Sequence, residues 1–95
     1  MSKVNTYRDI VLSDLIDCMD ELENSSKNSI VFCGFDLNGG NLIDKSFVIT
    51  KTNDKVWYVV ETYYPFSNKI DSSKTFCTYL DSDYKLHIDN NVNIV

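Results

Sequence analysis

Only one part of this sequence, residues 6–24, has the spacing of apolar residues that is expected of a helix. Apolar side chains recur there every three or four residues, so a helix would collect them on one stripe. Thr6 is a candidate N-cap, and the polar run Asn24-Ser25-Ser26 is expected to end the helix. The apolar positions are Val11, Leu12, Leu15, Ile16, Met19 and Leu22. Such a helix must bury its stripe against a surface that the rest of the chain supplies.

The remaining chain has the pattern of β-strands separated by short polar turns. The predicted strands span residues 29–35, 45–52, 55–64, 73–80 and 84–88. Their short connections favour an antiparallel meander. Residues 55–64 are apolar on both faces, which indicates a central strand. The predicted fold class is therefore α+β, with one N-terminal amphipathic helix packed on a four- to five-stranded antiparallel meander sheet.

Length and composition favour one small domain that folds without metal or disulfide. The chain has 95 residues, so we expect residues 1–95 to form a single domain. Hydrophobic residues make up 43% of it, enough for one core. Cys18, Cys33 and Cys77 are odd in number and distant in sequence, which favours reduced, mostly buried thiols. No segment has the pattern of a signal peptide or of a membrane span, so we expect a cytoplasmic protein with no membrane partner.

Negative charge is concentrated in the predicted helix. Of a net charge of −5, residues 1–25 carry −4, because they hold six acids and two cations. One interpretation is a solvated face on an acidic protein, since charge runs usually are solvated. The functional interpretation is a surface that docks on a basic groove of another protein; the same acidity disfavours direct nucleic-acid binding. The acids assigned to this surface are Asp14, Asp17, Asp20, Glu21 and Glu23.

Aromatic residues near the end of the third predicted strand form a second candidate for partner binding. Tyr63, Tyr64 and Phe66 flank Pro65, which is expected to end that strand. Most aromatic residues of the chain should belong to the core and to cross-strand pairs. These three can instead form an exposed patch, and tyrosine is a favoured residue at protein interfaces.

No pattern in the sequence indicates a catalytic, cofactor or metal site. His87 is the only histidine, and no motif links it to Cys33 as a nucleophile pair. Glu61 is a single carboxylate among aromatic residues, which is weak evidence for chemistry. Spaced cysteine and histidine ligands of the zinc-binding kinds are absent from the sequence. We therefore expect no enzyme, no cofactor and no metal; an enzyme that uses Cys33, Glu61 or His87 is the least favoured alternative.

The hypothesis that follows is a non-catalytic protein-binding inhibitor. The absence of Ala and Gln is typical of an AT-rich genome, and small acidic chains from such genomes fit inhibitors that phages or mobile elements encode. By that analogy the target is a host defence or nucleic-acid-handling protein, as for anti-CRISPR proteins. One alternative is an immunity protein that neutralises a basic toxin such as a nuclease. Another is a small structural or assembly protein that forms homodimers or larger homo-oligomers.

Overall fold

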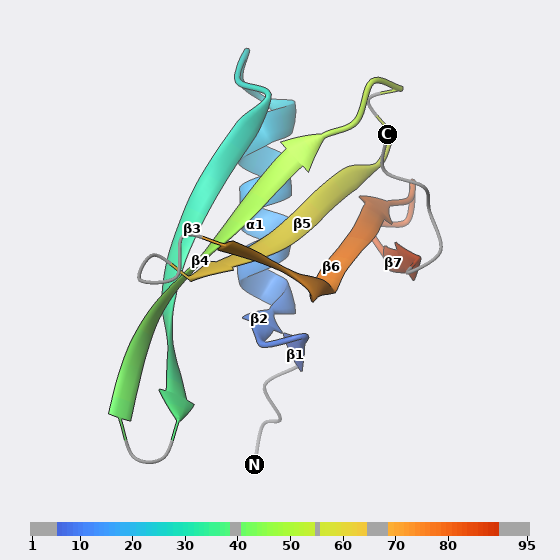
Figure 1. Cartoon of the computed structure of the whole chain (residues 1–95). Helices are drawn as coiled ribbons and strands as arrows, with labels where there is room; N and C mark the ends of the chain where they lie inside the picture. Colours follow the sequence, from blue (N-terminus) through green and yellow to red (C-terminus); the bar gives the residue numbers. More distant parts are fainter. Residues whose placement is uncertain (1–5, 39–40, 55, 65–68, 90–95) are drawn as a thin grey trace.

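One helix covers one face of a five-stranded antiparallel sheet in the computed structural model of the chain, as Figure 1 shows. The structure describes residues 6–38, 41–54, 56–64 and 69–89. Strand order in the sheet follows chain order, β3-β4-β5-β6-β7, so the predicted α+β meander is confirmed. The elements are β1 (Thr6–Tyr7), β2 (Ile10–Val11), α1 (Leu12–Glu23), β3 (Ser29–Asn38), β4 (Asn41–Lys51), β5 (Tyr58–Tyr64), β6 (Lys69–Leu80) and β7 (Leu86–Asp89).

The helix begins six residues later than residue 6, where the sequence predicts it, because a small hairpin precedes it. Thr6 pairs with Val11 in the β1–β2 ladder, so it is not the N-cap. Val11 takes the N-cap position without a side-chain hydrogen bond. Arg8 and Asp9 form the two-residue turn with positive φ values of 48° and 75°, as a type I′ hairpin turn requires. Arginine rarely adopts this conformation, which is why the pattern of residues did not indicate a turn.

The strands also differ from prediction at their ends. Strand β3 ends at Asn38 and strand β4 begins at Asn41, whereas the sequence predicts strands that end at residue 35 and begin at residue 45. Strand β5 starts at Tyr58 rather than at residue 55. The reason is Asp54, whose carboxylate accepts hydrogen bonds from the backbone N–H groups of Val56 (3.0 Å) and Trp57 (3.3 Å). These bonds hold the backbone in a turn and keep it out of the β4–β5 ladder.

Strand β5 is the central strand, as its apolar residues on both faces predict. Its pairing with β6 is irregular: Val60 lies opposite Phe76, whereas Thr62 lies opposite Asp71. The additional β6 residues between these partners make that strand change direction halfway along its length (Figure 1). The sheet therefore curls, and its β6–β7 side stands away from the plane of β3 and β4.

The core lies between α1 and the sheet face that the helix covers. Leu15 and Leu22 are completely buried there, and Met19 is 1% exposed. These side chains come from positions three or four residues apart, so the apolar stripe of α1 is confirmed for this part of the chain. The sheet contributes Phe47, Ile49, Tyr58, Val60 and Phe76 to the same cluster.

Within the described ranges, no helix combines the length and the apolar character that crossing a membrane requires.

Candidate functional site

The five acids assigned to partner binding all lie on α1, but they fall into two groups. Asp20 and Glu23 line a pocket beside the last turns of the helix. Asp14, Asp17 and Glu21 do not line it, and no side-chain hydrogen bond or ion pair with the described part of the chain involves them. Asp17 and Glu21 are exposed and Asp14 is half-buried. These three residues are called the outer acids below.

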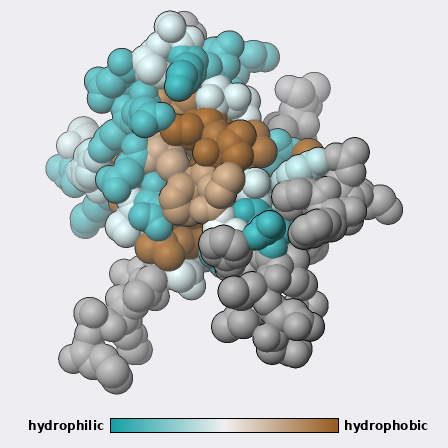
Figure 2. All heavy atoms as spheres, turned by 90° about the vertical axis from the view of Figure 1, so that its left-hand side faces the viewer, coloured by the Kyte–Doolittle hydropathy of each residue, from teal (hydrophilic) through white to brown (hydrophobic). Residues whose placement is uncertain are grey.

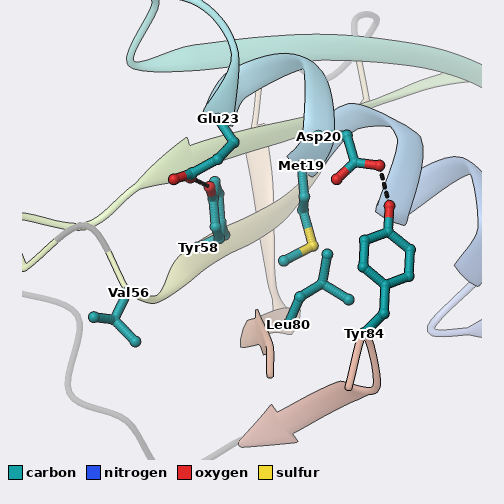
Figure 3. Close-up of a pocket in the computed structure, with 7 residues that line it drawn as sticks. All are labelled: Met19, Asp20, Glu23, Val56, Tyr58, Leu80 and Tyr84. Atoms are coloured by element: carbon teal, nitrogen blue, oxygen red, sulfur yellow. Dashed lines mark hydrogen bonds between the residues drawn. The ribbon is translucent and has the colours of Figure 1, made fainter. Parts of the chain in front are cut away.

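The pocket lies between the C-terminal half of α1 and the end of the sheet formed by β5 and β6, and it has a volume of about 320 Å³. Figure 3 shows Met19 and Leu80 between two tyrosine–carboxylate pairs, one on each side. On one side, the Tyr58 hydroxyl donates a hydrogen bond of 2.6 Å to Glu23 Oε2. On the other, the Tyr84 hydroxyl donates to Asp20 Oδ2. The pocket thus has an apolar floor and two carboxylates on its rim.

The turn after β6 positions Tyr84. The Asp81 carboxylate accepts hydrogen bonds of 2.9 Å from the backbone N–H groups of Asp83 and Lys85. The Tyr84 N–H donates to the Asp81 carbonyl, also at 2.9 Å. Tyr84 itself has a φ of 63°, a conformation that a bulky residue rarely adopts. The hydrogen bonds of the turn hold Tyr84 in this conformation, and its ring reaches α1 from there.

Both tyrosines have raised pKa values, for different main reasons. Burial is the largest cause for Tyr58, and the hydrogen bond to Glu23 adds to it. For Tyr84 the hydrogen bond to Asp20 is the largest cause, because a tyrosinate cannot donate to a carboxylate. Both tyrosines therefore stay neutral donors at neutral pH, and they bring no positive charge to Asp20 or Glu23.

The opposite end of α1 has basic residues around one acid. Asp9, three residues before the helix, lies 2.5 Å from Lys74 Nζ and 3.9 Å from Lys45 Nζ through its Oδ2 atom. Lys45 is buried, with only 4% of its side chain exposed. The Arg8 guanidinium donates to the carbonyl of Thr75 at 2.9 Å. The hydrogen bond from Lys74 is the main cause that lowers the pKa of Asp9, and it raises the pKa of Lys74 in turn.

The predicted aromatic residues do not join the helix acids on one surface. Tyr64 accepts a hydrogen bond of 3.2 Å from Lys74 Nζ, which places it near Asp9 at the far end of α1. Tyr63 lies opposite Ser46 on β4, and successive strand residues point to opposite faces of a sheet. Both tyrosines are half-buried. Phe66 lies outside the described residues.

The three residues considered as catalytic candidates lie apart from one another in the fold. Cys33 is exposed on β3 and His87 is on β7, and these are the two edge strands of the sheet. His87 Nε2 lies 2.6 Å from Asp81 Oδ2, and its ring stacks on that of Tyr79 at 4.6 Å. Glu61 is half-buried on β5 opposite Val48. The fold therefore does not build a Cys33–His87 pair.

Sequence reasoning missed the pocket and the two tyrosines that complete it. Tyr58 and Tyr84 contact acids that are 35 and 64 positions away in the chain. A local signal existed only for the acids, whose position near the negative end of a helix is unfavourable. Cys18 and Cys77 are buried as expected, whereas Cys33 is exposed.

Among the residues that the structure describes, no three His, Cys, Asp or Glu side chains gather in a way that could hold a metal ion. Comparisons with protein-family models, with curated proteins and with solved structures find no match to this chain.

Proposed function

We propose that this protein is a non-catalytic binding protein that inhibits another protein by docking the acidic surface of α1 on a basic groove. The observation that carries the proposal is the charge distribution of the helix. Its twelve residues hold five acids, and its last turn holds no basic residue. Three of these acids, the outer acids, have no side-chain partner in the described ranges.

This charge distribution costs helix stability, which supports a role beyond solvation. Acids near a helix C-terminus face the negative end of the dipole, and each such charge costs about 0.3–1 kcal/mol. Like charges three or four residues apart, such as Asp17 and Glu21, cost about 0.2–0.5 kcal/mol per pair. A basic partner removes both costs when it binds, because its cations neutralise the helix surface.

The proposed target is a nucleic-acid-handling or defence protein, which carries a basic groove for phosphates. By this proposal the protein is encoded by a phage or mobile element and acts in the manner of an anti-CRISPR protein. The same surface suits an immunity protein that neutralises a basic nuclease toxin. The gene neighbourhood separates these two targets: a phage genome supports the first, and an adjacent toxin gene supports the second.

The test compares two charge reversals of equal size on two surfaces. D17K/E21K reverses two exposed acids of α1, and D44K/D83K reverses two exposed acids elsewhere. The wild-type protein captures its partner from a lysate of the source cells, and the Kd of the purified pair is then measured at low and high salt. We expect D17K/E21K to weaken binding about tenfold or more at low salt, and less at high salt. Equal effects of the two variants, or no effect of D17K/E21K, would overturn the proposal.

A homo-oligomeric assembly protein is the second candidate, and strand β3 favours it. This edge strand is ten residues long, and Val31 on it is 59% exposed. Figure 2 views the molecule from the β3 side of Figure 1 and shows apolar atoms gathered in the middle of that face. A long, exposed edge strand is a template for pairing with another chain. Light scattering at micromolar concentration decides: a monomer of 10.9 kDa removes this candidate, and a dimer supports it.

A further inference from the structure

Both carboxylates of the pocket beside α1 have a tyrosine as their hydrogen-bond partner. Glu23 and Asp20 each accept a hydrogen bond from a neutral tyrosine, and a carboxylate has further lone pairs for additional donors. None of the cations in the described part of the chain forms an ion pair with either acid. The two acids are three residues apart on α1, and Figure 3 shows their carboxylates on opposite sides of the pocket. A cation with several donors that enters the pocket therefore lies between them.

The floor of the pocket has the opposite character. Met19 is 1% exposed in the core, and Leu80 lies beside it between the two tyrosines (Figure 3). Val56 adds a third apolar side chain to the lining and is 56% exposed. A volume of about 320 Å³ is at the small end for ligand sites, which suits one long side chain better than a cofactor. An occupant must combine an apolar stem with a positively charged head.

Arginine has these properties. Its methylene groups cover apolar surface while its head stays charged, and its planar guanidinium donates to carboxylates in a forked geometry. The guanidinium also stacks on aromatic rings, which lysine does less well, and Tyr84 at the rim is 54% exposed.

We propose that this pocket receives an arginine side chain of the basic partner, with its stem on Leu80 and its guanidinium between Asp20 and Glu23. The inference rests on the proposed function, because it assigns a specific anchor to the docking of α1. The outer acids then supply general attraction to the basic groove, and the pocket supplies the contact that fixes the position of the partner.

The first test uses a small probe in place of the partner. N-acetyl-arginine methylamide is titrated into the labelled protein and followed by NMR, with N-acetyl-citrulline methylamide as the uncharged control of the same shape. We expect saturable shifts at Met19, Val56 and Tyr84, with a Kd of about 1–10 mM. The citrulline probe should bind about tenfold more weakly, because it lacks the charge. Equal binding of the two probes, or no shift at these residues, would contradict the inference.

The second test uses two matched neutralisations. D20N/E23Q removes both charges of the pocket but keeps an oxygen acceptor for each tyrosine, whereas D17N/E21Q removes the same charge outside it. We expect D20N/E23Q to weaken binding of the arginine probe about tenfold and D17N/E21Q to change it less than about twofold. If both variants weaken binding equally, the probe responds only to the net charge of the protein, and the pocket is not its binding site.

The outcomes separate this inference from the proposed function. Partner binding that D17K/E21K weakens and D20N/E23Q leaves intact would support docking by α1 and reject the arginine pocket. Arginine-probe binding that D20N/E23Q abolishes, together with partner binding that D17K/E21K leaves intact, would support the pocket and reject docking by the outer acids.

Discussion

The acids at the two ends of α1 have different kinds of partner. At the N-terminal end, Asp9 is held by Lys74 and lies near the buried Lys45, so each charge of this group has an opposite charge nearby. At the C-terminal end, Asp20 and Glu23 accept hydrogen bonds from tyrosines and have no basic partner in the described ranges. At the N-terminal end the acid is paired with cations of the same chain, whereas at the C-terminal end the two acids have neutral hydrogen-bond donors beside them.

The two ends of α1 therefore differ in whether their charged residues serve stability or binding. An ion pair inside the chain adds to the stability of the folded state and leaves little charge for a partner. A neutral tyrosine that donates to a carboxylate orients the acid and preserves its charge, which is the property that a site for a cation needs. On this account the N-terminal end of α1 is structural, and the C-terminal end serves a partner.

The largest expected effect is on the free energy of unfolding, and it shows whether both ends of α1 pack in one core. Leu15 near the start of α1 and Leu22 near its end are both completely buried. Replacing either with Ala should lower the free energy of unfolding by about 2–5 kcal/mol, because the change leaves a cavity. Urea denaturation measures both variants. If L22A lowers the free energy of unfolding by less than about 1 kcal/mol, the C-terminal end of α1 is not packed in the core as described. The two ends would then differ in packing as well as in charge.

Neutralising the acid at the N-terminal end should destabilise the protein. D9N keeps a residue that tolerates the positive φ of position 9 but leaves Lys45 buried beside another lysine without an anion. We expect a loss of about 1–2 kcal/mol in the free energy of unfolding. This is less than for a fully buried pair, because 42% of the Asp9 side chain is exposed. An unchanged urea midpoint for D9N would show that this end is not held by its ion pairs.

The lowered pKa of Asp9 predicts that the stability of the protein depends on pH. The pKa of Asp9 is lowered from its ordinary value of 3.8, so its contribution to stability is complete above that value and is lost as the pH falls through the pKa of the folded state. The stability difference between wild type and D9N should therefore shrink below about pH 4. Denaturation of both proteins from pH 6 to pH 2 measures it, and a difference that stays constant over this range contradicts the role given to Asp9.

Removing the tyrosine hydroxyls should have a smaller effect. Y58F is expected to cost about 1 kcal/mol, because Tyr58 is only 5% exposed and loses its hydrogen bond to Glu23. Y84F should cost less, since Tyr84 is 54% exposed. The pKa of Tyr58 is raised above its ordinary value of 10.0, so its contribution should be lost as the pH rises above that value. Thermal unfolding at pH 7 and pH 11 checks both statements, and an equal cost for Y58F at the two pH values would contradict them.

The sequence predicted the parts of the fold that depend on local patterns. The stripe from Val11 to Leu22 indicated the helix, and the apolar residues on both faces of residues 55–64 indicated the central strand. The predicted start of the helix was wrong because contacts of Arg8 and Asp9 with β4 and β6 stabilise a turn that an arginine rarely adopts. Local propensity cannot include such distant contacts.

Only half of the candidate site, the acids of α1, could be predicted from the sequence. The acids of α1 were visible as a charge pattern, but the tyrosines opposite them depend on the register of β5 and on the turn before β7. Tyr58 was one of several aromatic residues on its strand, and nothing in the sequence distinguished it from Tyr63 or Tyr64. The position of a carboxylate on a helix can be read from spacing, whereas its partner on a sheet cannot.

The acids at the C-terminal end of α1 are expected to lower the stability of the fold. The most direct measurement is the free energy of unfolding of D20N/E23Q at low and high salt. We expect this variant to be more stable than wild type by about 0.3–1 kcal/mol at low salt, because it relieves the helix dipole and keeps both tyrosine acceptors. The gain should shrink at high salt. A loss of stability comparable to that of D9N would show that these acids hold the fold together, and it would contradict the account.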